Sequence, residues 1–238
     1  MKIVVLLRRL LSAPGTPARE VLGACEAAAL RAAATLRAAR PGATLAALAV
    51  GPERENEALT VAAALGARTY RLWDAALEGT DYDAYARAIA ATCKMIGYDL
   101  VIAGERSADE GLGVIGPATA EHLGIPHVTA ALDLGWHRTG RLMVRRREGR
   151  RVRTLGAVPP LLVTVGVGFC GAAAPAHMSS IPPLELVDLR RAGLVPEELK
   201  HRKQYAGEEA QVAKPVPRAE TAADAGGLLA RLKSDGLL

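Results

Sequence analysis

Short apolar runs alternate with longer helix-forming segments over the first two-thirds of the chain. A continuous apolar run is typical of a strand that is covered on both faces. Such runs predict strands at residues 3–7, 44–50, 69–73, 99–103, 128–132 and 161–165. Alanine-rich segments predict helices at residues 19–40, 53–65, 84–96 and from about 111 to 123. Because strands that alternate with helices require crossover connections, we expect a mostly parallel sheet with helices on both faces, a three-layer α/β fold of the Rossmann type.

The pattern changes after Asp133. Two arginine-rich runs, 141–147 and 151–155, flank Glu148-Gly149-Arg150, which predicts an antiparallel hairpin added to the α/β core. Arginines alternate there with Leu142, Val144, Val152 and Leu155, which favours a hairpin with one solvated face over a surface that binds phosphates or an acidic partner.

The C-terminal part has a different composition from the rest. Residues beyond about 181 are rich in charge, glycine and proline, with one short helix expected near 222–233. They offer too few apolar positions for a core of their own. We therefore expect an α/β nucleotide-binding-type domain at 1–181 and a C-terminal arm at 182–238 that wraps a partner subunit.

Composition narrows the functional classes. Aromatic residues make up only 3% of the chain, and the net charge of +5 comes largely from seven arginines between Arg141 and Arg153. Without interleaved aromatics for base stacking, the sequence gives no support for nucleic-acid binding. No segment approaches the roughly 18 apolar residues of a spanning helix, and three cysteines cannot all pair. A cytoplasmic protein without a membrane span is the simplest interpretation.

The segment from Asp99 to Thr129 carries the strongest functional signal. A buried strand ends at Gly104, a polar loop follows, and glycines 111, 113 and 116 precede Pro117 at the start of a helix. A strand, a loop and a helix N-terminus present backbone N–H groups to an anion, which predicts a phosphate site. The letters Gly-Leu-Gly-Val-Ile-Gly match a dinucleotide motif, but seven residues, 104–110, separate them from the apolar run of the strand, and this disfavours a true NAD fingerprint.

The sequence gives little support for an enzyme that carries out catalysis with its own side chains alone. The five histidines have no acidic or sulfur ligands at zinc spacing, and no nucleophile elbow or Walker lysine is present. The adjacent carboxylates Asp109 and Glu110 are more typical of residues at a helix N-terminus than of an acid–base pair.

Several motifs, in this order and spacing, make the chain similar to the β subunits of electron transfer flavoproteins. They span residues 1–181, and the stretch 74–81 resembles a segment of the electron-bifurcating branch. The matching pieces are Val50-Gly51-Pro52, Glu57-Ala58-Leu59, Ala63-Ala64-Leu65-Gly66-Ala67, Asp99-Leu100-Val101-Ile102-Ala103-Gly104, Asp109, Gly116-Pro117, Ala120-Glu121-His122-Leu123-Gly124-Ile125-Pro126 and Pro160-Leu161-Leu162-Val163-Thr164-Val165.

The resemblance implies a fold like that of the adenine nucleotide hydrolases and an α subunit as partner. Together the two subunits would carry electrons between a flavin-dependent dehydrogenase and an acceptor such as a quinone oxidoreductase. FAD would be held by or shared with the α subunit, and AMP or a second FAD would lie in this subunit. The implied pocket residues are Leu6, Cys25, Val50, Leu100, Ala103, Gly104, Glu105, Arg106, Ser107, Asp109, Gly111, Gly113, Val114, Ile115 and Gly116.

Some polar positions of the family motif are replaced in this chain. Gly111 and Val114 stand where the family has an Asp and a Gln, and residues 171–177 replace an Asn-x-Pro-Arg loop that reaches partner dehydrogenases. These changes leave open whether the pocket holds AMP, holds FAD or has lost its nucleotide. They also leave alternatives to electron transfer: an adenine-nucleotide-binding or structural protein without a redox role, and a stand-alone NAD enzyme built on residues 111–116. Any bound nucleotide is expected to have its phosphates held by backbone N–H groups of residues 111–116.

Overall fold

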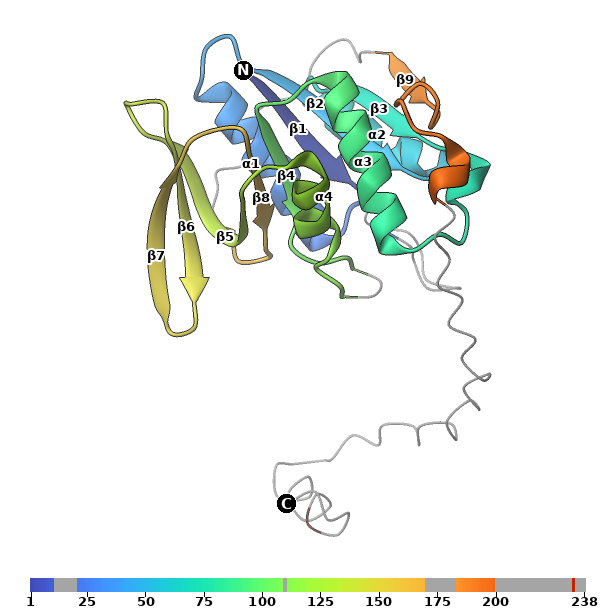
Figure 1. Ribbon diagram of the computed structural model, residues 1–238. Coiled ribbons are helices and arrows are strands. Elements are labelled where there is room, and N and C mark those ends of the chain that lie inside the picture. Colours follow the sequence, from blue (N-terminus) through green and yellow to red (C-terminus); the bar gives the residue numbers. More distant parts are fainter. Residues whose placement is uncertain (11–20, 109–110, 170–182, 200–232, 234–238) are drawn as a thin grey trace. The chain divides into compact units, whose positions relative to one another are not determined.

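The computed structural model describes residues 1–10, 21–108, 111–169, 183–199 and 233. Residues 1–202 form one compact unit, and of the second unit, 203–238, only Lys233 is described. The first unit is built around a single sheet of nine strands (Figure 1). Its strands are β1 (Lys2–Leu7), β2 (Thr44–Val50), β3 (Arg68–Leu72), β4 (Leu100–Gly104), β5 (His127–Trp136), β6 (Leu142–Glu148), β7 (Arg151–Ala157), β8 (Leu161–Val165) and β9 (Leu184–Val187).

Four α-helices cover the two faces of this sheet. They are α1 (Ala24–Ala38), α2 (Asn56–Ala64), α3 (Tyr82–Ile96) and α4 (Ile115–Leu123), with short 3-10 helices η1 (Glu53–Glu55), η2 (Ala75–Leu77) and η3 (Pro196–Leu199). Helices α1 and α2 pack with one apolar cluster, and α3 and α4 with the other, so the unit has three layers. The expected three-layer α/β fold is confirmed.

The strand order is β7-β6-β5-β8-β4-β1-β2-β3-β9, and the six central strands pair in parallel. Continuous apolar runs explain the centre: Ile3, Leu100 and Leu161 lie side by side in register and are at most 1% exposed. Strand β9, which the sequence pattern did not predict, pairs in parallel with β3 and places residues 184–187 in the sheet. The function of the following segment as a partner-binding arm stays a prediction.

The first helix begins later than its alanine content suggests. We expected it from Arg19, but Leu22 forms an antiparallel bridge with Arg9, and Gly23 is extended at the N-cap. The helix therefore starts at Ala24, and its side towards the sheet is buried along the whole length. The expected helix near 222–233 lies outside the described residues except for Lys233.

The hairpin is present, but its two strands differ in exposure. Gly149 and Arg150 form a two-residue loop, because Glu148 pairs with Arg151. In β6 the alternation predicted a buried face, and Leu142 and Val144 are fully buried. The expectation of a single solvated face fails for β7, where Val152 is 51% and Leu155 36% exposed. None of the helices in the described part of the chain covers β7.

Among the described residues, none of the helices combines the length and the apolar character that crossing a membrane requires.

Candidate functional site

The connections of the sheet change direction between β1 and β4. The chain runs from β1 through α1 to β2 on one side, and from β3 through α3 to β4 on the other side of β1. In open α/β sheets such a switch point leaves a crevice outside the carboxyl ends of the two strands, where ligands bind. The candidate site is therefore at the ends of β1 and β4, next to residues 105–108 and 111–114 of the following loop.

The start of α1 packs closely against the end of β4 and the first residues of the loop. A Cβ placed on Gly104 would lie 3.1 Å from the Cβ of Cys25, and one placed on Gly23 would lie 3.0 Å from the Cβ of Ala108. The helix thus approaches the end of β4 so closely that these two positions admit no larger residue without movement. This contact places Cys25 beside Gly104 at the end of β4, and its part in a ligand site stays a prediction.

Each of the three glycines in the Gly-x-Gly-x-x-Gly run has its own structural role. Gly111 has φ +68°, a conformation that glycine adopts without strain. A Cβ on Gly113 would lie 2.7 Å from the carbonyl oxygen of Glu105, and one on Gly116 would lie 2.6 Å from Cγ2 of Thr164. The first glycine therefore turns the chain, the second packs the loop on itself, and the third lets α4 approach β8.

Helix α4 begins without a capping side chain, unlike its neighbour α3. Asp81 caps α3 by accepting a hydrogen bond from the Ala84 N–H at 2.9 Å. The N-cap of α4 is Val114, which makes no such bond, and the first turn of α4 contains no acidic residue. The first N–H groups of a helix have no partner inside the helix, so this end of α4 is open to an anion. At α1, by contrast, Glu26 already brings a carboxylate to the first turn.

The described residues of the loop carry few polar and charged side chains. The hydroxyl oxygen of Ser107 is buried and has no hydrogen-bond partner among the described residues. Arg106 is largely exposed, with its Nε 3.9 Å from a carboxylate oxygen of Glu105. The Glu105 side chain lies against Gly166 at the end of β8, where an added Cβ would overlap it. Among the described residues of the loop, the side chains thus supply one basic group, one acidic group and one hydroxyl without a partner.

Apolar side chains form an exposed rim around the same crevice. Leu112 and Val114 are each 41% exposed, and Val167, just beyond the end of β8, is 69% exposed. The rim occupies positions where a polar group would be expected to face a phosphate. The side chains of Leu112, Val114 and Val167 offer no hydrogen-bond donor to an anion.

The structure brings together most of the residues that the sequence predicted for the site. Ala103 and Gly104 end β4, Glu105 to Ser107 and Gly111 to Val114 form the loop, and Ile115 and Gly116 open α4. Leu6 and Val50 lie near the carboxyl ends of β1 and β2, at the same edge of the sheet. Leu100 is not part of this group: it is fully buried at the amino end of β4, four residues and roughly 13 Å of strand away from Gly104. Asp109 lies outside the described residues.

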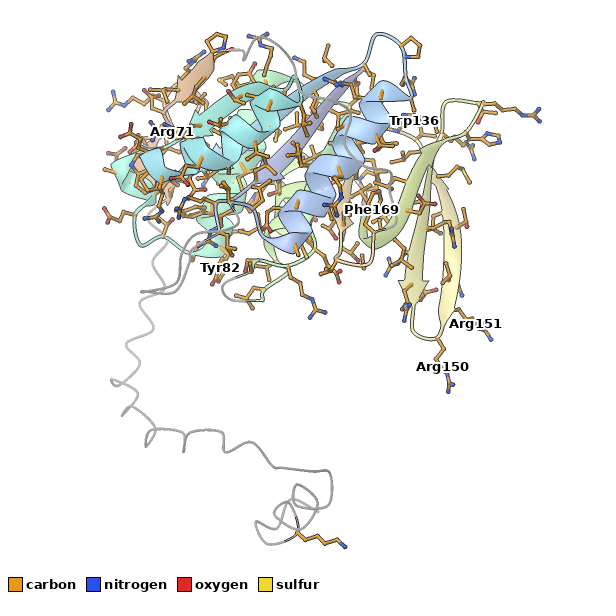
Figure 2. The ribbon with its side chains drawn as sticks, turned by 180° about the vertical axis from the view of Figure 1, so that it is seen from behind. Arg71, Tyr82, Trp136, Arg150, Arg151 and Phe169 are labelled. Atoms are coloured by element: carbon orange, nitrogen blue, oxygen red, sulfur yellow. The ribbon has the colours of Figure 1, made fainter. Side chains whose placement is uncertain are left out.

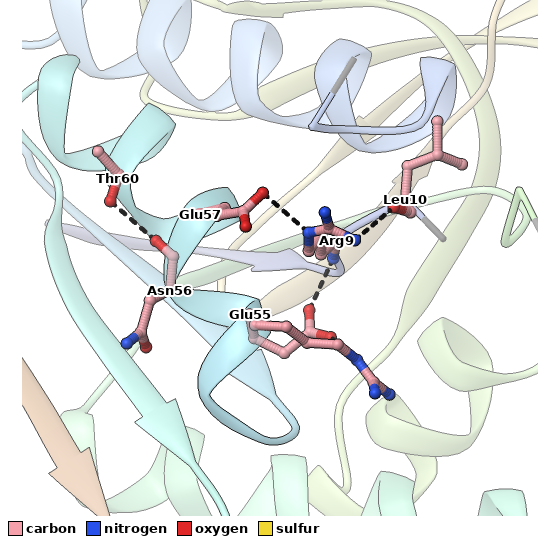
Figure 3. Close-up of polar contacts among 7 residues, drawn as sticks. Arg9, Leu10, Glu55, Asn56, Glu57 and Thr60 are labelled. Atoms are coloured by element: carbon pink, nitrogen blue, oxygen red, sulfur yellow. Dashed lines mark hydrogen bonds and ion pairs between the residues drawn. The ribbon is translucent and has the colours of Figure 1, made fainter. Parts of the chain in front are cut away.

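Sequence reasoning missed a buried carboxylate at the ends of β1 and β2. Glu55, 3% exposed, accepts a hydrogen bond from the Arg9 backbone N–H at 2.7 Å, while the Arg9 Nε donates to Glu57 at 2.9 Å (Figure 3). Gly51 allows this arrangement, because a Cβ there would lie 2.6 Å from Cγ of Glu55. The Gly51-Pro52 pair was the available signal. These contacts hold the β2–α2 turn against the chain that leaves β1, next to the crevice.

Burial raises the pKa of Glu55 above its ordinary value of 4.5, and nearby Arg9 and Arg54 only partly offset this. Because the pKa is higher in the folded chain, the protonated carboxyl favours folding. That contribution is complete below the unfolded pKa and is lost as the pH rises through the folded pKa.

We therefore expect Glu55→Gln to raise the free energy of unfolding at pH 7, with the gain shrinking as the pH falls towards 4.5. Urea unfolding at a series of pH values measures this. The control Glu57→Gln removes the more exposed partner of the same arginine and should change stability by less than about 1 kcal/mol throughout. A Glu55→Gln variant that is less stable than the parent at pH 7 would show that Arg9 and Arg54 outweigh burial.

The described residues contain no group of three or more histidine, cysteine or acidic side chains that could hold a metal ion. The described residues at the ends of β1 and β4 offer glycines, a helix N-terminus without a capping side chain, and exposed apolar side chains.

Comparison with known proteins identifies the family. The model of the electron transfer flavoprotein domain matches residues 18–188, which is more than half of the chain and includes every element of the crevice after β1. The chain belongs to the electron transfer flavoprotein family.

Relatives within this family are named as β subunits. The chain is 30% identical over 154 residues to an electron transfer flavoprotein subunit beta of Methylophilus methylotrophus, covering 62% of this chain and 58% of that protein. It is 42% identical over 89 residues to the subunit beta of Clostridium acetobutylicum, covering 37% and 34%. It is 33% identical over 126 residues to the caffeyl-CoA reductase-Etf complex subunit CarD of Acetobacterium woodii, covering 50% and 48%. The matches thus span about a third to three-fifths of these relatives.

Proposed function

We propose that the chain is the β subunit of a heterodimeric electron transfer flavoprotein. With an α subunit it passes electrons between a flavin-dependent dehydrogenase and an acceptor such as a quinone oxidoreductase. The observation that carries the proposal is the family match over residues 18–188, which include every strand of the sheet except β1. The relatives named as β subunits support the same assignment.

The crevice of this subunit is proposed to hold AMP or a second FAD. Two features of the described residues fit an adenine nucleotide: the uncapped start of α4 and the glycines of the loop. The backbone N–H groups of Val114, Ile115 and Gly116 would hold the phosphates. Arg106 would supply the positive charge, and Asp109 would orient the loop or accept from a ribose hydroxyl.

The redox flavin is proposed to be FAD, held by or shared with the α subunit. When bound, FAD accepts and donates electrons one or two at a time, a chemistry that no side chain in the described crevice provides. This chain would contribute the exposed apolar rim of Leu112, Val114 and Val167 to the surroundings of that cofactor or of the α subunit. The C-terminal arm from residue 182 is proposed to wrap the α subunit.

A cytoplasmic location completes the proposal. Cys25 and Cys93, the two cysteines among the described residues, are both free and buried. Burial also raises the pKa of the Cys93 thiol to about 12, which keeps it unreactive. These thiols are compatible with a reducing compartment.

Co-expression with an α-like subunit encoded nearby tests the proposal. We expect a yellow heterodimer that elutes as one species in size-exclusion chromatography. Separate elution, together with an α-like partner that binds flavin at full affinity unaided, would contradict it. Calorimetric titration of AMP, ATP, FAD and NADH into the isolated chain tests the alternative, because binding of ATP alone would favour a nucleotide-binding protein without a redox role.

A further inference from the structure

We propose that Glu55 is a positioning residue for the nucleotide crevice: it fixes the chain that leaves β1 and thereby holds the start of α1 against the end of β4 and the loop that follows. The proposal rests on the proposed nucleotide site and deepens it, because it names a residue that acts on this site through the backbone. Each step between Glu55 and the loop is a contact between described residues.

Glu55 is a buried carboxylate in a turn that leaves room for it. It ends η1, directly before α2, which covers the same face of the sheet as α1 (Figure 2). Its backbone N–H donates to the Pro52 carbonyl at 3.0 Å, and the side chain lies over Gly51, where an added Cβ would be 2.6 Å from its Cγ. Because a buried carboxylate needs hydrogen-bond donors, its position and that of its donor are strongly linked.

The donor belongs to the chain that leaves β1. Strand β1 ends at Leu7, and the backbone N–H of Arg9 donates to Oε2 of Glu55 at 2.7 Å (Figure 3). The Arg9 side chain makes separate bonds, to Glu57 at 2.9 Å and to the Leu10 carbonyl at 3.2 Å. Glu55 therefore holds the Arg9 backbone at a point where β1 has ended, whereas Glu57 contacts only the side chain.

The same stretch of backbone pairs with the chain that enters α1. Arg9 forms an antiparallel bridge with Leu22, and the Leu10 N–H donates to the Val21 carbonyl at 2.8 Å. The next residue, Gly23, is the N-cap of α1. A displacement of Arg9 is thus passed to the first turn of α1 through one short backbone pairing.

The first turn of α1 contacts the candidate site with little space to spare. An added Cβ on Gly23 would lie 3.0 Å from the Cβ of Ala108, and one on Gly104 would lie 3.1 Å from the Cβ of Cys25. Contacts this close are lost when the helix start moves by a small amount. The loop then loses its support on the α1 side, and its backbone N–H groups lose the fixed directions that a bound phosphate requires.

A purely stabilising role fits Glu55 less well. Burial raises the pKa of this carboxyl above 4.5, so the charged form that prevails at pH 7 disfavours the folded chain. Groups that cost stability in this way are typical of functional sites, where a defined geometry matters more than stability.

The reactivity of Cys25 in the ligand-free full chain tests the mechanical step. Cys25 is 8% exposed, and its alkylation by iodoacetamide is followed by mass spectrometry of the peptide that contains it. We expect Glu55→Ala to raise the rate at least about tenfold, because α1 then leaves Gly104 more often. Glu55→Gln should stay within about twofold of the parent, since its amide oxygen accepts the same hydrogen bond.

Cys93 is the internal control for this measurement. It is fully buried in α3, on the other face of the sheet, and should keep its rate in every variant. Equal increases at Cys93 and Cys25 in Glu55→Ala would indicate general unfolding and would overturn the proposal. An unchanged rate at Cys25 would overturn it too.

Calorimetric titration of the full chain with AMP and with FAD tests the effect on the crevice. Glu55→Ala should weaken the binding of the nucleotide that the parent binds at least about fivefold, and Glu55→Gln should retain it. The matched control Glu57→Ala removes the more exposed partner of the same arginine, leaves the backbone bond in place, and should change affinity less than about twofold.

The two measurements separate this proposal from the proposed function. Unchanged affinity in Glu55→Ala, or an equal loss in Glu55→Gln, would overturn the positioning role in a parent that binds nucleotide. A parent that binds neither AMP nor FAD would contradict the proposed nucleotide site, and the rate at Cys25 would then decide alone whether Glu55 holds the start of α1.

Discussion

A Gly113→Val variant is expected to lose nucleotide from the crevice, with an affinity at least about 100-fold lower, or about 2.8 kcal/mol. The Cβ alone would lie 2.7 Å from the backbone carbonyl of Glu105, so the loop must change its path to accommodate valine. The exposed loop contributes little to the core, so the variant should still fold. Calorimetric titration with AMP and FAD measures the loss, and circular dichroism checks the fold.

Ser107→Ala is the matched control for this loop. If backbone N–H groups hold the phosphates, removing the Ser107 hydroxyl should change affinity little. Removing a buried hydroxyl without a partner can even stabilise the chain. An empty site in Ser107→Ala together with a filled site in Gly113→Val would show that side chains, not the backbone, bind the nucleotide.

A Gly116→Val variant is expected to lower the free energy of unfolding by about 3 kcal/mol, the upper part of the range for overpacked cores. The added Cβ would lie 2.6 Å from Cγ2 of Thr164, which is buried in β8 under the first turn of α4. For a chain of this size the change corresponds to a fall in Tm of roughly 6–12 °C. Chemical unfolding and calorimetric melting measure both quantities.

The neighbouring threonine provides a rescue. Thr164→Ser removes the methyl group in conflict but keeps the hydroxyl that accepts a hydrogen bond from the Ala130 N–H at 3.0 Å. Gly116→Ala should lower the free energy of unfolding of the parent. In the Thr164→Ser background the same substitution should lower it less, or even raise it, because alanine stabilises a helix by about 1 kcal/mol relative to glycine. Equal effects of Gly116→Ala in both backgrounds would place the conflict elsewhere.

The central strands of the fold could be predicted because their sequence signal is local. Strands β1, β2, β4 and β8 are covered on both faces, so each is a continuous apolar run with recognisable ends. The end of α4 was also predictable, because Gly124 adopts the left-handed conformation that commonly terminates helices. Here local preference and the final fold agree.

Other elements depend on contacts between distant residues. Strand β5 extends to Trp136 because its first part pairs with β8 and its second part with β6, and the switch occurs at Ala130, with φ +58°. Strand β9 exists only by pairing with β3, more than 100 residues earlier. No short-range pattern in residues 128–136 or 184–187 contains this information.

The position of the candidate site in the fold could be predicted from the sequence, but the full set of residues around it could not. The glycine pattern located the loop and α4, and the parallel topology then located Leu6 and Val50 at the same edge. Leu100 was predicted as a pocket residue because it lies in the run of residues that matches the family. In the structure it is the first residue of β4, at the end of the strand away from the site. Glu55 was missed, because its burial arises from the meeting of β1, β2 and Gly51.

The non-protein content of the purified heterodimer tests the account most directly. The complex, co-expressed with its α-like subunit, is denatured, and the released ligands are quantified by absorbance and mass spectrometry. We expect FAD together with either stoichiometric AMP or a second FAD, and we expect this additional nucleotide, but not the first FAD, to be lost from the Gly113→Val complex. A complex that releases no flavin, or an additional nucleotide that Gly113→Val leaves in place, would contradict the account.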